Sequence, residues 1–282
     1  MIQKEFDNKV MVFLTRVVLL SLCLGIAGCS TRNKNADDNE AAANIRRLER
    51  LGSYEVAADK SVSPLRAQML REAALSIGAR GGLSYRSSQI NNIILKYESG
   101  LTRTFNFSGL MLDDNVLPPV LIESNNTLKL SNDQTIRVSD KTFEIIAQAK
   151  FITAAPTWKD YLIVNFQKPE DPASGLLPKT PGERMIWRKY IKKGWQAGIK
   201  QADSIFSENI ARLTRDFKGM VRYHNLLAHN MVTPPYVAGI NLGVTGDTSK
   251  VNIHDRVLRI TALPGINIDS SQWKTIVSQN ER

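Results

Sequence analysis

Hydrophobic positions change their spacing several times along the chain, and these changes predict alternating helices and strands. From about Ala41, apolar residues recur every three positions, which is typical of a helix. Ser63-Pro64 predicts a helix start, because serine caps a helix well and proline suits its first turn. The glycine-rich residues 78–82 predict the end of that helix, and a second helical pattern begins near Tyr85. A phosphate-binding loop is the other interpretation of these glycines, but no strand precedes them and the Walker lysine–serine pair is missing.

The apolar period shortens to two between Leu101 and Phe166, which predicts strands. Short apolar segments are separated there by Asn125-Asn126 and by Asn132-Asp133, pairs that are typical of turns. We therefore expect an antiparallel meander in which each pair makes a turn. Residues 168–181 hold four prolines and predict a long loop.

The longest helical pattern runs from Pro181 to about His229. One face of this helix carries an apolar stripe: Trp195, Ile199, Ala202, Phe206, Ile210, Leu213, Phe217 and Val221. Such a stripe favours core packing over a groove for a partner. Strands return after His229, with a turn at Thr245-Gly246-Asp247. These patterns predict an α+β fold in which helices flank a mainly antiparallel sheet, with one folded domain over residues 41–282.

Composition places the chain among folded proteins and leaves its N-terminus as the unusual part. The chain has 282 residues, 43% of them hydrophobic, and a net charge of +10. Its one long apolar run, Val17–Ile26, follows a basic start and precedes small residues, as in a secretory signal peptide. A membrane span needs about 20 apolar residues, so this run is too short to be one.

The end of this signal resembles the lipobox of bacterial lipoproteins, because it reads Ile26-Ala27-Gly28-Cys29. That resemblance implies removal of residues 1–28 and covalent attachment of lipid, including fatty acyl chains such as palmitate, to Cys29. An ordinary secretory signal with a chance cysteine is the alternative. Ser30 follows the cysteine where aspartate would favour the inner membrane, so we expect anchoring at the periplasmic face of the outer membrane. Residues 29–40 are polar and predict a flexible tether.

Candidate catalytic chemistry is sparse in this sequence. The two cysteines, Cys23 and Cys29, both belong to the N-terminal signal region, and His224 and His229 lie five positions apart, not four as in a helical zinc pair. Asp113-Asp114 has no evident partner. We expect no enzymatic activity, no metal and no cofactor apart from the lipid on Cys29. A periplasmic cell-wall hydrolase and a lipid-anchored ligand-binding protein are the alternatives.

The first turns of the helix that begins at Pro181 gather an excess of positive charge. This charge opposes the helix dipole, which is compatible with a contact role. The candidate residues for contact with a protein partner or lipid head groups are Arg184, Arg188, Lys189, Lys192, Lys193 and Lys200. No direct nucleic-acid contact is expected, because the aromatic residues have core spacing and do not interleave with the basic ones.

Long strings of residues make the chain similar to DotC-like lipoproteins of type IVB secretion systems, the Dot/Icm systems, and to their counterparts in IncI-type conjugation. The strings are Arg71-Glu72-Ala73-Ala74-Leu75-Ser76-Ile77-Gly78-Ala79-Arg80, Asn115-Val116-Leu117-Pro118-Pro119-Val120, Pro156-Thr157-Trp158-Lys159-Asp160-Tyr161-Leu162 and Arg256-Val257-Leu258-Arg259-Ile260-Thr261-Ala262-Leu263-Pro264. Shorter matches occur around Phe105-Asn106-Phe107 and Gly194-Trp195. The resemblance covers residues 62–275.

The resemblance implies a non-enzymatic member of an outer-membrane core complex. It implies that a DotD-like lipoprotein and a DotH-like secretin component are partners, that the chain helps to place the secretin in the outer membrane, and that copies form a ring. Effector secretion and plasmid conjugation both remain open as the process served.

Overall fold

The computed structural model describes residues 34–51 and 62–274, and its contacts divide the chain into two compact units. Within the described residues, unit 1 holds 34–51, 62–104 and 163–208, and unit 2 holds 105–162 and 209–274. The expected signal peptide, 1–28, and Cys29 lie outside the described residues. We describe each unit by itself.

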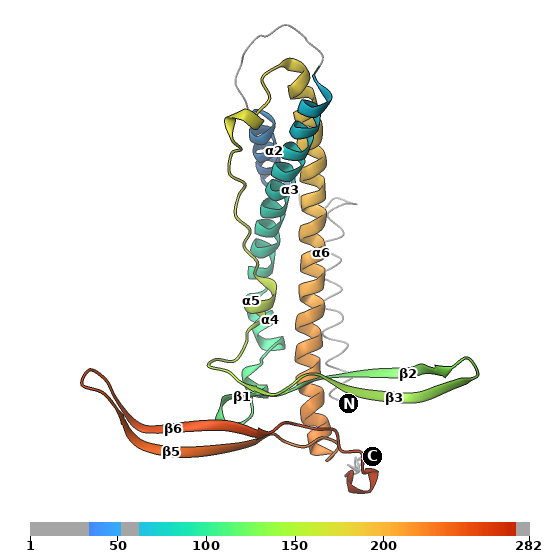
Figure 1. Ribbon diagram of the computed structural model, residues 1–282, viewed down its shortest axis with the longest axis vertical. Coiled ribbons are helices and arrows are strands. Elements are labelled where there is room, and N and C mark those ends of the chain that lie inside the picture. The colour runs from blue at the N-terminus through green and yellow to red at the C-terminus, as the bar shows by residue number, and fades with distance from the viewer. Residues whose placement is uncertain (1–33, 52–61, 275–282) are drawn as a thin grey trace. The chain divides into compact units, whose positions relative to one another are not determined.

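Unit 1 is built from helices (Figure 1). They are α2 (Lys34–Glu49), α3 (Pro64–Leu95), α4 (Glu98–Thr104) and the first part of α6 (Pro181–Ala228). The predicted start at Ser63-Pro64 is confirmed, because the Ser63 hydroxyl accepts a hydrogen bond from the backbone N–H of Arg66 at 3.4 Å. The helix predicted from about Ala41 begins at Lys34, seven positions earlier, and so includes part of the segment expected as a tether.

The prediction that a helix ends at residues 78–82 is wrong, because α3 continues through them to Leu95. Glycine costs a helix interior about 1 kcal/mol relative to alanine, so local propensity alone favours a break. Here the glycines are buried against α6. Close packing against that helix offsets their low helix propensity. The neighbouring helical pattern from Tyr85 is therefore the second half of the same helix.

The contact between α3 and α6 is made by glycines spaced four apart on both helices. Gly78 and Gly82 on α3 face Gly194 and Gly198 on α6. The two helices lie side by side in Figure 1. A Cβ at Gly82 would overlap the carbonyl oxygen of Trp195, and one at Gly198 would lie 2.7 Å from the backbone N of Leu83. The missing side chains allow the two backbones to touch, as small residues do in closely packed helix pairs.

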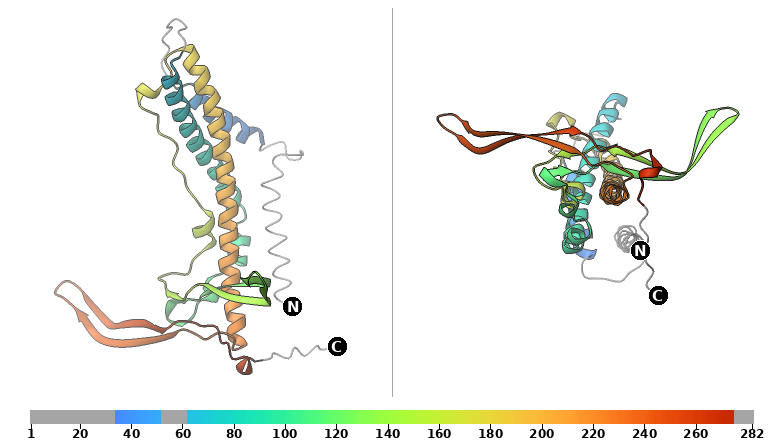
Figure 2. Two further views of the ribbon diagram at one scale, coloured as in Figure 1. Left: turned by 45° about the vertical axis from the view of Figure 1, so that its right-hand side comes forward. Right: turned by 90° about the horizontal axis from the view of Figure 1, so that it is seen from below.

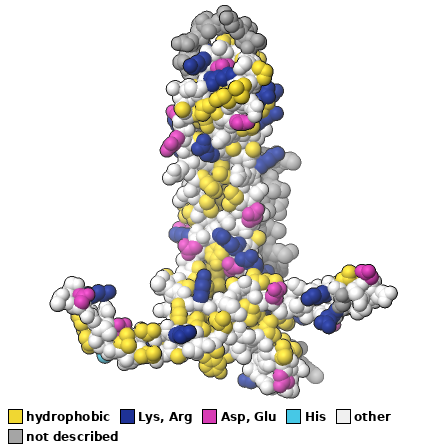
Figure 3. Space-filling model, in the orientation of Figure 1, with side chains coloured by type: hydrophobic (Ala, Val, Ile, Leu, Met, Phe, Trp, Pro, Cys, Tyr) yellow, Lys and Arg dark blue, Asp and Glu magenta, His cyan; other side chains and the backbone are white. Residues whose placement is uncertain are grey.

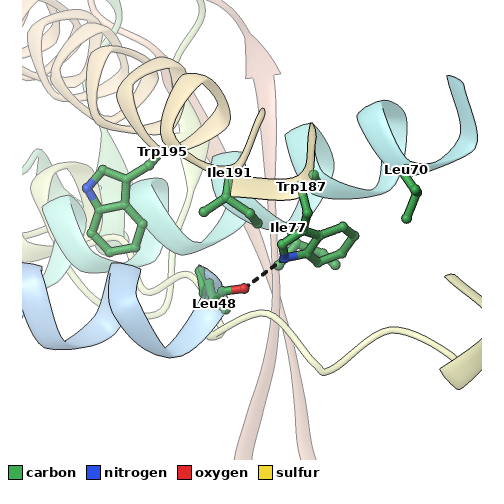
Figure 4. Packing of buried hydrophobic residues seen from close by; sticks show 7 residues of the cluster. Leu48, Leu70, Ile77, Trp187, Ile191 and Trp195 are labelled. Atoms are coloured by element: carbon green, nitrogen blue, oxygen red, sulfur yellow. Dashed lines mark hydrogen bonds between the residues drawn. The ribbon is translucent and has the colours of Figure 1, made fainter. Parts of the chain in front are cut away.

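Large side chains fill the space around this seam and hold α2 in place. Trp187 and Ile191 of α6 are fully buried, with Leu70 and Ile77 of α3. The indole Nε1 of Trp187 donates a hydrogen bond to the backbone oxygen of Leu48 at 2.9 Å, which satisfies the only polar group of that buried ring (Figure 4). This bond and the Leu48 side chain dock the C-terminal end of α2 on the pair α3–α6.

The proline-rich segment is a long loop, as predicted, with one short 3-10 helix at Ser174–Leu176. The residues just before it, 163–167, are bound to α3 by side chains that reach their backbone. The Ser84 hydroxyl donates to the Phe166 oxygen at 2.9 Å, and the Asn91 amide donates to the Val164 oxygen at 3.0 Å. The approach to the loop therefore has fixed hydrogen-bond partners on α3.

Unit 2 holds the strands, which form two-stranded antiparallel sheets in place of one meander. The pairs are β1 (Val116–Leu117) with β4 (Lys150–Phe151), β2 (Val120–Asn132) with β3 (Thr135–Ala147), and β5 (Tyr236–Gly246) with β6 (Val251–Ala262). A short helix, α5 (Trp158–Leu162), and the second part of α6 complete the unit.

The turn predicted at Asn125-Asn126 is wrong, whereas the turn at Asn132-Asp133 is confirmed. Strand β2 runs through both asparagines and stays paired with β3, where Asn125 lies opposite Lys141. Asn126 does adopt a positive φ of 51°, which asparagine tolerates well. The left-handed residue thus makes a local irregularity in a continuous strand, because the cross-strand pairs on both sides of it hold the register.

The core of unit 2 lies between the end of α6 and the first residues of β2. Leu121 and Tyr223 are fully buried in one cluster with Leu226 and Val232. Gly219 allows this approach, because a Cβ there would meet the backbone N of Leu121 at 3.0 Å. Six of the eight residues of the apolar stripe on α6 are buried, so the stripe is core packing, as predicted.

The predicted α+β class with antiparallel strands is confirmed. The turn at Thr245-Gly246-Asp247 is also confirmed, because the Asp247 carboxylate accepts hydrogen bonds from the backbone N–H groups of Ser249 and Lys250 between β5 and β6. Among the helices within residues 34–51 and 62–274, none combines the length and apolar character needed to cross a membrane.

Alanine at Gly82 or Gly198 tests the glycine seam. Each new methyl group must push the two backbones apart, and overpacking of this kind costs about 1–3 kcal/mol, more than the gain in helix propensity. We expect a lower urea midpoint when unfolding is followed by circular dichroism. Gly175→Ala is the matched control, since nothing lies within 4 Å of a Cβ there. Unchanged or higher midpoints for both seam variants would contradict the close contact.

Candidate interaction surface

The six basic residues predicted as a contact site lie on the part of α6 that belongs to unit 1. We call them the basic segment: Arg184, Arg188, Lys189, Lys192, Lys193 and Lys200. All of them are exposed except Arg184, which is half-buried. The positions 184, 188 and 192, and likewise 189 and 193, are four apart, so they form two adjacent rows along the helix. Lys and Arg side chains are visible on the surface of the helical unit in Figure 3.

Local sequence fixes where the helix that carries this segment begins. Pro181 occupies the first helical position, where its missing N–H costs nothing. The Thr180 hydroxyl accepts a hydrogen bond from the backbone N–H of Glu183 at 3.2 Å, as in a capping box. The Glu183 carboxylate in turn accepts from the backbone N–H of Lys179 at 2.7 Å. These bonds satisfy donors at the helix start.

Glu183 is buried, and its charge is compensated by Arg66 of α3. Burial raises the pKa of this carboxyl, but hydrogen bonds from Arg66 and from the Lys179 N–H outweigh it, so the pKa is lower than usual. The guanidinium of Arg66 also donates to the backbone oxygens of Gly175 at 2.6 Å and Leu177 at 2.8 Å. Because Glu183 is paired in this way, its negative charge does not neutralise the basic segment beside it.

Lys192 and Lys193 of the basic segment each contact a side chain of unit 1. Lys192 lies 3.7 Å from the Glu49 carboxylate of α2, while its side chain stays two-thirds exposed. The Lys193 ammonium lies 5.3 Å from the centre of the Tyr190 ring, and the Arg71 guanidinium approaches that ring at 5.7 Å. Such exposed contacts are weak, so these cations keep most of their capacity to bind an anionic partner.

Sequence reasoning missed a second group of basic residues, the three arginines at the end of α2. Arg46, Arg47 and Arg50 line a shallow depression together with Ala43 and Leu51. Arg47 forms an exposed ion pair with Asp171 at 3.3 Å, and the other two are exposed. Cations are favourable near a helix C-terminus. The arginines in the last turn of the predicted helix were the sequence signal that could have identified this group.

The α2 arginines and the basic segment are parts of one unit because α2 docks on α6. The ion pair between Glu49 and Lys192 and the hydrogen bond from Trp187 to Leu48 join the two helices directly. The segments are far apart in the sequence, so their combination follows from the fold. Together they give unit 1 a surface suited to anionic groups, either acidic side chains or lipid phosphates.

The histidines and acidic pair considered in the sequence have ordinary local roles in unit 2. The His224 Nε2 atom hydrogen-bonds to the Leu110 oxygen at 2.8 Å, and His229 Nδ1 to the Asn225 oxygen at 2.6 Å. Asp113 and Asp114 are exposed in a 3-10 turn. No group of three His, Cys, Asp or Glu residues able to hold a metal ion occurs in the part of the chain that the structure describes.

Two tyrosines of unit 2 have strongly raised pKa values because of their packing. Burial, with help from the nearby Asp216 carboxylate, raises the pKa of Tyr161 to about 12. Tyr161 donates to Asp216 at 3.2 Å and stacks on Phe107 with ring centres 5.7 Å apart. Burial also raises the pKa of Tyr223 to about 12. Both phenols stay protonated at neutral pH, which suits structural hydrogen bonding.

Comparison with known proteins supplies a family. The family model T4SS_TraI, described as "Type IV secretory system, conjugal DNA-protein transfer", matches residues 64–275. No curated protein matches the chain. The matched range holds α3, the basic segment and both long hairpins, so the family description applies to the parts of the fold described above.

Replacing Glu183 by glutamine tests the ion pair at the start of α6. We expect a loss of about 2 kcal/mol of unfolding free energy at pH 7, since the buried negative charge that pairs with Arg66 is removed and an N–H donor replaces one accepting oxygen. A lowered folded-state pKa means that the carboxylate stabilises fully above its unfolded pKa and loses this effect as pH falls through the folded value.

The difference between wild type and Glu183→Gln should therefore shrink below about pH 4 in urea unfolding measured at several pH values. Asp171→Asn is the control, because its pair with Arg47 is exposed and should change stability by less than about 0.5 kcal/mol. A difference that grows as the pH falls would contradict the assignment.

Proposed function

The chain belongs to the T4SS_TraI family of type IV secretory, conjugal DNA–protein transfer proteins, and we propose that it is a non-enzymatic outer-membrane lipoprotein of such a system. In this proposal it is anchored through Cys29 at the periplasmic face. There it helps to target and assemble the secretin-like outer-membrane pore. The observation that carries the proposal is the family match over residues 64–275, together with the lipobox-like Ile26-Ala27-Gly28-Cys29 before it.

Physical chemistry supports the anchor. A single acyl chain binds a membrane marginally and reversibly, whereas two or more hold stably, so a diacylated cysteine is sufficient to keep a folded domain at the bilayer. Cys29 and the rest of residues 29–33 lie outside the described residues, and the first described helix begins at Lys34, within the expected tether. We propose that the lipid on Cys29 is the protein's only covalently held group and that no metal or other cofactor takes part.

The proposed partners are a DotD-like lipoprotein, a DotH-like secretin component and further copies of this chain in a ring. Lys192, Lys193 and the α2 arginines support a binding role. These cations are exposed and their contacts within unit 1 are weak, so they are available to acidic protein surfaces or anionic lipid head groups. We propose that they contact a core subunit or the membrane surface, and that nucleic acid is not a direct ligand. Effector secretion and plasmid transfer are both consistent with this role.

Cys29→Ser tests the anchor in cells that carry the whole secretion system. Without the thiol no thioether lipid forms, so we expect the protein to leave the outer-membrane fraction and the secretin component to be lost from it as well. The fractions are compared by immunoblot after density-gradient separation.

Cys23→Ser is the matched control, because this cysteine lies inside the apolar run and would be removed with the signal. It should leave fractionation unchanged. Normal outer-membrane location of the Cys29→Ser protein would refute the lipid anchor.

A triple variant with glutamine at Lys192, Lys193 and Lys200 tests the basic segment. These side chains are exposed, so the fold should survive while three positive charges are lost. We expect the amount of core subunits that co-purifies with the protein to fall severalfold, measured by quantitative mass spectrometry.

The matched control carries glutamine at three other exposed lysines of unit 1, Lys96, Lys168 and Lys179. It loses the same net charge at other positions. Equal co-purification in both triple variants would show that charge at the basic segment has no special role.

A further inference from the structure

The α2 arginines line a shallow depression of about 550 Å³ on the surface of unit 1. Arg46 and Arg50 lie four positions apart, with the Arg50 N–H bonded to the Arg46 oxygen at 3.1 Å, so their side chains share one side of the helix with Arg47. Ala43, one turn earlier, and Leu51 are the other described residues that line the depression. None of these five residues is acidic. We call this side of α2 the arginine face.

Packing of the opposite side of α2 turns the arginine face outward. Leu48 is buried in one cluster with Trp187 of α6, and Ile45 packs against the same cluster. The hydrogen bond from Trp187 to the Leu48 oxygen holds this side in place. In Figures 1 and 2, α2 lies against the side of the pair α3–α6. Unit 1 therefore presents the three arginines in one direction.

The arginines keep most of their hydrogen-bond donors for a ligand. The Arg46 Nε donates to the Ala42 oxygen at 2.7 Å, which leaves its two terminal amino groups. Arg47 pairs with Asp171 at 3.3 Å through one terminal nitrogen, and both side chains are more than half exposed. Within the part of the chain that the structure describes, the Arg50 guanidinium has no hydrogen bond or ion pair. Each guanidinium carries five N–H donors, so most of them are available.

Stabilisation of the helix end does not account for three arginines. Cations near a helix C-terminus are favourable where they approach its last carbonyl groups, and among the described residues Arg46 is the arginine that reaches a carbonyl of α2. Like charges four positions apart repel each other. The nearby Glu49 carboxylate does not offset this repulsion, because it is only 15% exposed and lies 3.7 Å from Lys192. An anion bound in the depression would relieve it.

Phosphate is the anion that suits this group of arginines best. A planar guanidinium donates two parallel hydrogen bonds to the oxygens of one phosphate, and a phosphate has further oxygens for a second arginine. A carboxylate of a protein partner has two oxygens, which a single guanidinium already occupies. The depression is open to solvent, so it admits a phosphate group carried by a larger molecule.

Chain length keeps the arginine face within reach of the bilayer when the protein is anchored through Cys29. Five residue steps separate Cys29 from Lys34, and an extended chain spans at most about 18 Å over them. Helix α2 rises about 1.5 Å per residue, so Arg46 lies about 18 Å beyond Lys34 along the helix. The chain before α2 is therefore long enough for the helix to lie along the surface that holds the lipid, with its arginines at the head groups.

We propose that the arginine face binds the phosphate groups of anionic lipids in the membrane to which Cys29 is anchored. The inference rests on the proposed function, and it names lipid, in place of a core subunit, as the partner of the α2 arginines. Because α2 is docked on α6 through Leu48, the contact also holds unit 1 in one orientation on the bilayer. Each cation close to an anionic bilayer strengthens binding about fivefold, so the three arginines together contribute on the order of 100-fold.

A single thiol on the arginine face tests the contact. The full-length chain carries Ala43→Cys together with Cys23→Ser and Cys29→Ser, so the introduced thiol is the only one and no attached lipid is needed. Vesicles of phosphatidylcholine, either alone or mixed with an equal amount of phosphatidylglycerol, are added, and labelling by a polyethylene glycol maleimide is followed on gels. We expect the vesicles with phosphatidylglycerol to slow labelling at least about fivefold, and phosphatidylcholine alone to leave it nearly unchanged.

Replacing the three arginines by glutamine should raise the amount of phosphatidylglycerol vesicles needed for half protection on the order of 100-fold. The matched control loses the same charge at three other exposed arginines of unit 1 and should stay close to the starting chain. The test variant combines Arg46→Gln, Arg47→Gln and Arg50→Gln, and the control combines Arg71→Gln, Arg80→Gln and Arg103→Gln. Circular dichroism of each purified chain checks that it is folded.

Equal protection in the two triple variants would overturn the proposal. So would equal protection of a thiol introduced by Ser76→Cys, at an exposed position of α3, because it would show that vesicles shield unit 1 without regard to the arginine face. If glycerol phosphate in solution protects the thiol as well as vesicles do, the ligand is a soluble phosphate and the assignment to lipid is wrong.

Failure of this contact is distinguishable from failure of the proposed function, because the labelled chain lacks Cys29. Protection by phosphatidylglycerol, combined with normal outer-membrane location of the Cys29→Ser protein in cells, would support the contact and refute the anchor. No protection, combined with loss of that location, would refute the contact alone.

Discussion

The contact between α3 and α6 depends on Gly78, Gly82, Gly194 and Gly198, whose missing side chains allow one helical backbone to lie against the other. The rest of unit 1 is arranged around this seam. Because the backbones touch, the large rings of Trp187 and Trp195 pack beside the seam. There they form one buried cluster with Leu48 of α2, and Trp187 donates a hydrogen bond to the Leu48 backbone oxygen. The cost of four glycines in helix interiors is offset by the packing that only glycine permits.

The same geometry determines where charge appears. Arg66 and Glu183 pair at the end of the seam, so the one acid in the first turn of α6 is used internally. The basic residues on the outer face of α6 remain exposed, and docking of α2 adds its arginines to the same unit. Exposed positive charge of this kind is suited to contact with anionic groups.

Sequence reasoning succeeded where the signal was local. The cap at Ser63, the long helix after Pro181 and the turn at Asp247 are each specified by residues within a few positions, and the structure contains all three. It failed where contacts with a segment distant in the sequence determine the local structure. Residues 78–82 break a helix in isolation, and only the glycines more than a hundred positions later explain why α3 continues.

The candidate site, too, could be predicted from the sequence only in part. The basic segment could be found from its composition. The α2 arginines could not be joined to it, because α2 and α6 meet only after folding, through the Trp187–Leu48 hydrogen bond and the Glu49–Lys192 ion pair. Alternation of apolar residues predicts one buried face for each long hairpin. Leu128 and Ile136 of β2–β3 and Val244 and Ile253 of β5–β6 are instead 58–72% exposed, because each long hairpin pairs only within itself.

The central functional claim is that this chain acts as a lipid-anchored member of a type IV secretion assembly. Mass spectrometry of the N-terminal peptide, taken from protein extracted from outer membranes, tests it most directly. The account predicts a peptide that begins at Cys29 and carries the added mass of a diacylglyceryl group and an acyl chain. A peptide that begins elsewhere, or an unmodified cysteine at position 29, would contradict it.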